Sequence, residues 1–209
     1  MKLHTCTGAP SPRRVTLYLQ AKGIELEQVE VDLQTGEHLG SSFLAKSPDG
    51  TVPVLELDCG RTIWDSIAIR RYLEDLHPDP AMMGATAEAR AEVIQWTNWV
   101  IERGLLAVAE AFRNRFPGFR DHALTGAQPI AQIEALAERG LTRYPHFLDA
   151  LNDRLEQSSY IGGAQFSVAD IDALVTIDFA ERAIKIGPED GQTALNAWRD
   201  TVNARLGTG

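Results

Sequence analysis

The stretch DGTVPVLELDCGRTIWDSIAI, residues 49–69, decides how the first part of this 209-residue chain folds. Two short runs rich in β-branched residues, 51–57 and 61–65, flank an Asp-Cys-Gly turn and predict a β-hairpin. From Ser66 the apolar residues follow a helical period until HPDP ends it. Pro53 lies inside the first run, where a strand residue would donate its N–H. By itself, such a proline is typical of a trans bond at a strand edge.

The residues before the hairpin predict a strand, a helix, a second strand and a short helix or turn. Residues 1–3 begin the first strand, and the alternation in IELEQVEVDL predicts the second. The helix between them is expected over residues 13–23, with Ser11 as N-cap, Pro12 at the first helical position and Gly23 as its stop. The order over residues 1–78 is therefore βαβαββα, with a parallel first pair of strands.

The second half of the chain contains only helical patterns. A linker at 79–86 separates the α/β domain, residues 1–78, from an all-helical domain, residues 87–209. The expected helices cover 87–116, 131–140 continuing into 141–155, 168–185, and 193–205. The run FSVADIDALV contains an S-x-x-D box, which predicts that Ser167 and Asp170 cap the start of one helix reciprocally. The fold class is thus α/β followed by all-α.

Composition excludes several function classes. A net charge of −9 opposes binding to nucleic acid, although a local pocket can still attract a small anion. The sequence has no secretory signal pattern and no apolar run long enough to span a membrane. Cys6 and Cys59 form neither a CxxC nor a zinc motif, and no nucleotide-binding or metal motif is present. A cytoplasmic protein without metal, nucleotide, membrane or nucleic-acid partners is expected.

Several motifs resemble the cytosolic glutathione transferases, in a bacterial form similar to the plant phi and theta-like branches. GEHLGSSFLAKSPDGTVPVLE and WDSIAIRRYLED resemble the glutathione-site pattern of that family, and FSVADIDALVTIDFA resembles its C-terminal capping box. SPRRVTLYLQAKGIELEQVEVDL resembles its first helix and second strand. The resemblance covers nearly the whole chain, and the motifs occur in the same order as in the family. It implies a thioredoxin-like first domain and a helical second domain that carries the second-substrate site.

The resemblance also implies how glutathione is bound. Pro53 would follow a cis peptide bond, and the main chain of Val52 would pair with the cysteinyl part of glutathione. Asp65 would contact the γ-glutamyl ammonium, while Ser66, as a helix N-cap, would contact the carboxylate. His38 falls where plant-type members place a histidine that contacts the glycine carboxylate; a solvated surface residue is the alternative. The next position, which is often lysine, is Leu39 here.

The motifs offer two candidates for the residue that stabilises the thiolate. Family members with a catalytic serine carry it where this chain has Ala9, which has no hydroxyl. In another branch an asparagine of a T-P-N pattern contacts the sulfur, and Ser11 aligns with it. Ser11 is therefore the first candidate, through its hydroxyl or its own N–H, and a purely helix-capping role is the alternative. Cys6, which could form a mixed disulfide with glutathione, is the second candidate.

The expected function is conjugation of glutathione to a small electrophile by a homodimeric transferase involved in detoxification. Two alternatives remain at this point. One is glutathione-dependent reduction of disulfides or peroxides, and the other is a non-enzymatic regulatory or assembly module. Neither the electrophile nor the residues of the second-substrate site follow from the sequence.

Overall fold

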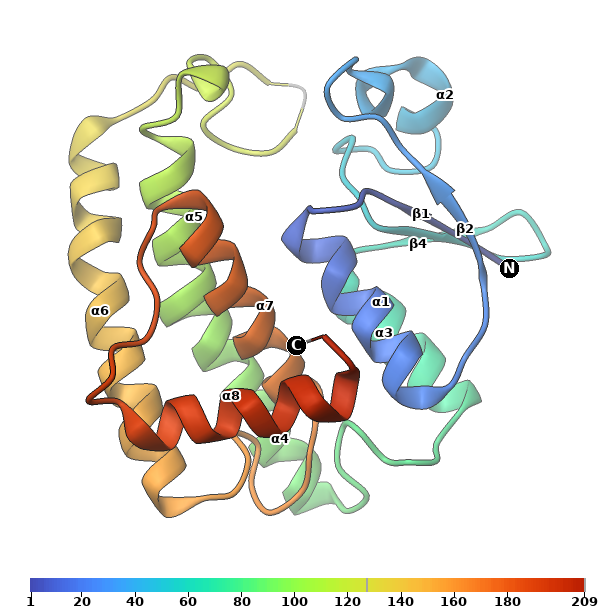
Figure 1. Ribbon diagram of the computed structural model, residues 1–209. Helices are drawn as coiled ribbons and strands as arrows, with labels where there is room; N and C mark the ends of the chain where they lie inside the picture. Colours follow the sequence, from blue (N-terminus) through green and yellow to red (C-terminus); the bar gives the residue numbers. More distant parts are fainter. Residues whose placement is uncertain (127, 209) are drawn as a thin grey trace. The chain divides into compact units, whose positions relative to one another are not determined.

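The stretch 49–69 forms a hairpin that leads directly into a helix, as predicted (Figure 1). In the computed structural model, which describes residues 1–126 and 128–208, β3 (Val54–Glu56) pairs with antiparallel β4 (Thr62–Trp64). Helix α3 (Ser66–Leu76) follows at once. The Val52–Pro53 bond is cis, which confirms that expectation. Pro53 precedes β3, so its missing N–H interrupts no pairing of the hairpin.

The first half of the chain has the predicted βαβαββα order. Strand β1 (Lys2–Thr5) lies parallel to β2 (Glu27–Glu30) and antiparallel to β3, so the sheet order is β2-β1-β3-β4. Helix α1 (Pro10–Lys22) connects the parallel pair and lies beside α3 (Figure 1). Gly23 ends α1 with a φ of 66°, as predicted for a left-handed C-cap.

The start of α1 differs from the prediction. The helix begins at Pro10, Ala9 is its N-cap, and no side chain caps it. Ser11 is therefore the second helical residue and not the N-cap, and Pro10 rather than Pro12 holds the first position. Both prolines suit a first helical turn, where N–H groups have no partner in the helix. The sequence pattern alone could not decide between them.

The segment between β2 and β3 forms two short helical turns. These are the 3₁₀-helix η1 (Glu37–Leu39) and helix α2 (Ser41–Leu44). Phe43 of α2 joins Val31 and Val54 in a small buried cluster at this part of the sheet. The cluster anchors the segment in spite of its short helices.

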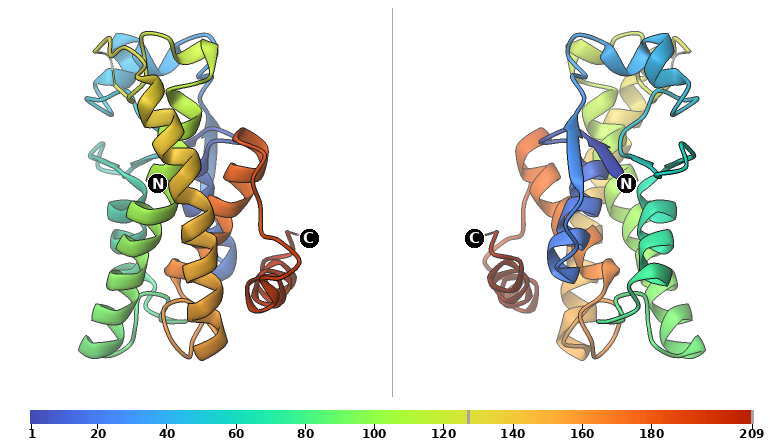
Figure 2. Two further views of the ribbon diagram at one scale, coloured as in Figure 1. Left: turned by 90° about the vertical axis from the view of Figure 1, so that its left-hand side faces the viewer. Right: turned by 90° about the vertical axis from the view of Figure 1, so that its right-hand side faces the viewer.

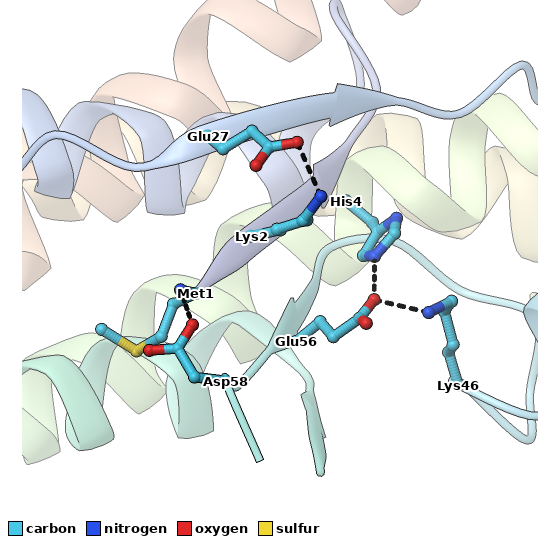
Figure 3. A network of polar contacts seen from close by, with 7 residues as sticks. All are labelled: Met1, Lys2, His4, Glu27, Lys46, Glu56 and Asp58. Carbon is cyan, nitrogen blue, oxygen red and sulfur yellow. Dashed lines mark hydrogen bonds and ion pairs between the residues drawn. The ribbon is translucent and has the colours of Figure 1, made fainter. Parts of the chain in front are cut away.

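A polar network also ties this segment to the sheet (Figure 3). The carboxylate of Glu56 in β3 contacts His4 Nε2 at 2.8 Å and Lys46 Nζ at 2.5 Å. Hydrogen bonds from Lys46 and His4 hold the pKa of Glu56 at about 2, well below its usual value. Lys46, which lies two residues after α2, is thus held to the central strand β3 by a charged hydrogen bond.

The second half consists of helices, as predicted, but one expected helix is interrupted. Helix α4 (Ala87–Val100) continues through a π-helix, η2 (Ile101–Leu105), into α5 (Leu106–Arg113). A Cβ on Gly104 of η2 would lie 2.6 Å from the ring of Phe147, so the π-helix brings backbone against an aromatic side chain. A 3₁₀-helix, η3 (Pro117–Phe119), follows α5.

The remaining helices are α6 (Glu134–Gln157), α7 (Val168–Ala183) and α8 (Thr193–Leu206). Helix α6 packs along α5, and α8 packs against α6 and α7 (Figure 2). The capping box at the start of α7 is present as predicted, with Ser167 and Asp170 as its members. Asp170 also accepts the indole N–H of Trp198 in α8, so this buried carboxylate links two helices.

The chain divides into two compact units. One comprises Met1–Pro80 with Leu124–Ile130, and the other comprises Ala81–Ala123 with Ala131–Gly209. The first contains the sheet and α1–α3, and the second contains α4–α8. Residues 124–130, which the sequence placed in the helical domain, group with the first unit. Across the described residues, no helix is long and apolar enough to cross a membrane.

Candidate functional site

The predicted site residues come from loops, helix starts and one 3₁₀-helix that follow or precede the strands at one end of the sheet. His4 pairs with Val54, and Val54 pairs with Trp64, so the end of β1, the start of β3 and the end of β4 are neighbours. The parallel strand β2 ends there too, because Thr5 pairs with Glu30. Pro53 precedes β3 and Asp65 follows β4. Ligands of α/β sheets bind outside the carboxyl ends of parallel strands, which is this end.

Asp65 shapes the start of α3. Its carboxylate accepts the N–H groups of Ile67 and Ala68 at 2.8 and 3.1 Å, so Asp65 is the N-cap, and the expectation that Ser66 is the cap is wrong. Asp65 has a φ of 81°, a backbone conformation that favours glycine. Strain of this kind is concentrated at functional sites, where the surrounding structure holds it.

Ser66 is the first residue of α3 and is 2% exposed. In the described part of the chain, neither its hydroxyl nor its N–H is engaged in a hydrogen bond. A helix N-terminus carries partial positive charge and free N–H groups. Ser66 therefore offers two donors to an anion, such as a carboxylate, beside the negative charge of Asp65.

Ser11 lies in the first turn of α1, the helix that follows β1. Pro10 and Pro12 have no N–H, so Ser11 supplies the one N–H of the first three helical positions. Within residues 1–126 and 128–208, neither this N–H nor the Ser11 hydroxyl makes a hydrogen bond. A second helix N-terminus at this end of the sheet thus has donors available for an anion.

Val52 is half-buried and packs against the cluster around Phe43. Its main chain precedes β3, and among the described residues it has no hydrogen-bond partner. An extended main-chain segment with free N–H and C=O groups can pair with a peptide-like ligand. The geometry fits the expected role of Val52, with Pro53 fixed in the cis form beside it.

His38 lies in η1, and its Nδ1 is buried without a hydrogen-bond partner in the described residues. Burial lowers the pKa of His38, against the opposing effect of Glu37. A neutral imidazole is therefore favoured at neutral pH, and it can give one hydrogen bond rather than a full charge to a ligand.

Cys6 has an environment that opposes a thiolate. Burial and then the carboxylate of Glu30 raise the pKa of the Cys6 thiol, and the N–H of Leu33 only partly offsets this. Glu30 also accepts the N–H and the hydroxyl of Thr7, which fixes its charge beside the loop. Reactive cysteines have lowered pKa values. The role of Glu30 was not predicted, because it depends on two strand ends meeting in space.

No metal site is evident at this end of the sheet or elsewhere in residues 1–126 and 128–208. No group of three or more His, Cys, Asp or Glu side chains in that part of the chain could hold a metal ion.

Comparisons with known proteins agree with this geometry. The model for the glutathione S-transferase N-terminal domain matches residues 9–76, and that for the C-terminal domain matches residues 107–205. Glutathione S-transferase 2 of Saccharomyces cerevisiae is 30% identical over 213 residues, which cover 98% of this chain and 86% of the yeast protein.

Solved structures give the same result. A glutathione S-transferase domain-containing protein of Marinobacter aquaeolei superposes with a TM-score of 0.91 and 32% identity, over 100% of both chains. A glutathione S-transferase of class Gtt2 from Vibrio parahaemolyticus is 36% identical, with a TM-score of 0.84 over 100% of this chain and 95% of that one. From its sequence, its fold and these relatives, the chain belongs to the glutathione S-transferase family.

Proposed function

We propose that the protein is a glutathione transferase, which binds glutathione at the end of the sheet described above, stabilises its thiolate and conjugates it to a small electrophile. The observation that carries the proposal is the convergence of two helix N-termini and a free main-chain segment at this end. Ser11, Val52 and Ser66 each have unused hydrogen-bonding groups there. Glutathione has two carboxylates, an ammonium, peptide groups and a thiol, and these groups need such partners.

The γ-glutamyl end would be bound at α3. Its carboxylate would accept hydrogen bonds from the hydroxyl and N–H of Ser66, with support from the helix dipole. Its ammonium would lie against the carboxylate of Asp65, of which only one oxygen, Oδ1, accepts the N–H groups of the helix. The carboxylate and the ammonium of the γ-glutamyl group would thus contact complementary groups on two adjacent residues, Ser66 and Asp65.

The other two parts of glutathione would use the segment between β2 and β3. The cysteinyl peptide group would pair with the main chain of Val52, and the glycine carboxylate would accept a hydrogen bond from His38. With Leu39 in place of the family's frequent lysine, and with the pKa of His38 lowered, the glycine end would be held by hydrogen bonding more than by charge.

The thiolate would be stabilised at the start of α1. A free cysteine-like thiol has a pKa of about 8.5, so only a few per cent is ionised at pH 7. The N–H of Ser11 is fixed in direction by the helix and adds to the dipole, and the hydroxyl is a second donor at the same position. Each unit by which they lower the thiol pKa requires about 1.4 kcal/mol of preference for the thiolate. The proton leaves to solvent. The sulfur then forms its bond to the electrophilic carbon, either as a leaving group departs with the electron pair of its bond or, in an addition, as a π bond opens and its electron pair takes up a proton from solvent.

Membership of the family also supports a proposal for the assembly and setting. We propose a homodimer in the cytoplasm that acts in detoxification, with residues 1–78 binding glutathione and residues 87–209 carrying the second-substrate site. Reduction of disulfides or peroxides with glutathione remains the alternative activity. The raised pKa of Cys6 disfavours a version of that chemistry that uses a protein thiol.

The proposal is tested by isothermal calorimetry with glutathione and with its disulfide. We expect glutathione to bind, and Ser66→Ala to raise its Kd about tenfold, since the hydroxyl's hydrogen bond to a carboxylate is lost while the N–H of residue 66 remains. Ser42→Ala, which alters an exposed serine, is the matched control and should leave Kd unchanged. If neither ligand binds, the proposal is contradicted, and tighter binding of the disulfide than of glutathione would favour the reductase.

A further inference from the structure

Ser47 is a polar residue with no exposed surface, five positions before Val52. It lies in the turn that joins α2 to β3, outside both elements. It lies in the stretch that resembles the family's glutathione-site pattern, but the sequence analysis assigned it no role. Buried hydroxyls in proteins are nearly always hydrogen-bonded, so its partners show what the residue holds in place.

Every polar group of Ser47 is engaged, by the turn or by the helix before it. Its Oγ accepts the N–H of Thr51 at 3.1 Å and lies 3.3 Å from the Thr51 hydroxyl. Its own N–H donates to the carbonyl of Phe43 at 2.9 Å, and its carbonyl accepts the N–H of Gly50 at 2.9 Å. Phe43 belongs to the buried cluster against the sheet. Ser47 thus connects a core residue to the residue directly before Val52.

The same turn contacts the segment that carries His38. Gly50 has a φ of 59°, and a Cβ there would lie 2.8 Å from the carbonyl oxygen of His38. The two backbones therefore touch at this point. A change in the course of residues 47–51 would shift the contact with His38 and the direction of Val52 together.

We propose that Ser47 is a positioning residue for glutathione: through Thr51 and Gly50 it holds the main chain of Val52 and the backbone of His38 in one arrangement. This inference rests on the proposed function, because the two residues it positions are those expected to bind the cysteinyl and glycine parts. Ser47 itself does not touch the ligand.

The inference predicts an effect on binding that is separate from the chemical step. Without the Ser47 hydroxyl, the N–H of Thr51 loses its acceptor in a half-buried turn, and the turn gains alternative conformations. Glutathione must then order the turn when it binds, which raises Kd. Ser11 lies on α1, a different element, so the stabilised thiolate is unaffected once glutathione is bound.

The test compares two matched pairs of variants by calorimetry and steady-state kinetics. Ser47→Ala should raise the Kd and KM for glutathione about tenfold and leave kcat at saturation within twofold, whereas Ser42→Ala should change neither. Thr51→Val, which removes the second hydroxyl but keeps the N–H, should raise Kd about threefold. Thr51→Ser, which keeps both groups, should bind like the wild type.

The link to His38 has its own probe, the dipeptide γ-glutamylcysteine, which lacks the glycine. Because this ligand cannot use His38, Ser47→Ala should weaken its binding less than it weakens the binding of glutathione. Equal losses for the two ligands would contradict the part of the inference that concerns His38.

The outcomes separate this inference from the proposed function. If wild-type protein fails to bind glutathione, both are wrong. If the wild type binds glutathione and folded Ser47→Ala binds it equally well, the inference alone is wrong. A fall in the kcat of Ser47→Ala with an unchanged KM for glutathione would also overturn it. If circular dichroism shows that Ser47→Ala does not fold, the Kd of Thr51→Val for glutathione is compared with that of Thr51→Ser. Equal Kd values for these two variants would then overturn the inference.

Discussion

The first turn of α1 shows how single residues decide what a site can do. Pro10 and Pro12 occupy helical positions and remove two of the N–H groups that a helix start normally offers. Ser11, between them, keeps its N–H and has no partner for it in the described part of the chain. The donor that remains is therefore directed by the backbone, whereas the Ser11 hydroxyl is free to rotate.

This difference separates the two donors of Ser11 experimentally. Ser11→Ala keeps the N–H, so we expect the pH midpoint of kcat/KM for glutathione to rise by less than about half a unit. Ser11→Pro removes the N–H at a position where proline is tolerated, and we expect a rise of about one unit, the value of one hydrogen bond to a charged group. The pH profile of the conjugation rate measures both.

Thermal denaturation of both Ser11 variants is the control, since the midpoint can be compared only between folded proteins. A shift of a full unit in Ser11→Ala would contradict the assignment to the N–H and make the hydroxyl the main donor.

At the residue scale, the sequence predicted where the helices start more closely than it predicted the capping role of each residue there. Ser11, Asp65 and Ser66 were all selected, but two N-cap assignments were wrong by one or two positions. Ser, Asp and Pro are all typical of a helix start, so their order leaves the first helical residue open. Which one caps depends on where the preceding strand ends.

At the scale of elements, prediction succeeded where local signals were strong. The hairpin and α3 were predicted because a Gly-containing turn, β-branched runs and a terminal proline mark their limits. The π-helix η2 was not predicted, because it lies where Gly104 packs closely against Phe147 of a different helix, α6. Contacts of that kind leave no periodic pattern in the sequence. The same holds for the network around Glu56, which joins three separated segments.

That network predicts an acid-sensitive part of the fold. The pKa of Glu56 is lowered from 4.5 to about 2, because Lys46 and His4 hydrogen-bond to its carboxylate. A depressed pKa means that its stabilisation is complete above the unfolded value, near 4.5, and is lost as pH falls toward 2. We expect Glu56→Gln to lower the free energy of unfolding by about 1 kcal/mol at pH 7, as for a well-formed, partly exposed ion pair.

Urea unfolding between pH 2 and 7 measures the free energy of unfolding. The difference in this free energy between wild type and Glu56→Gln should shrink as pH falls below about 4.5. Glu25→Gln, at an exposed carboxylate without a partner among the described residues, is the matched control. A difference between wild type and Glu56→Gln that stays constant over this range would contradict the argument.

At the scale of the whole molecule, the chain still exposes large apolar side chains beside the proposed glutathione site. Trp64 at the end of β4 is 44% exposed, and Ile67 in the first turn of α3 is 40% exposed. Single exposed apolar residues are common, but two within four residues, on either side of the start of α3, suit a contact between subunits. The family resemblance implies a dimer, and the sequence alone could not locate its contact.

We therefore expect sedimentation equilibrium to give about 46 kDa, twice the 23.0 kDa of one chain. Ile67→Glu should shift the protein toward the monomer by placing a charge in an apolar contact. The variant should still fold, because an acidic residue in the first helical turn suits the helix dipole. Leu76→Glu, at the other end of α3 and 49% exposed, is the matched control and should remain dimeric. A wild-type protein that sediments as a monomer at micromolar concentration would refute the dimer, and a dimeric Ile67→Glu would place the contact on another surface.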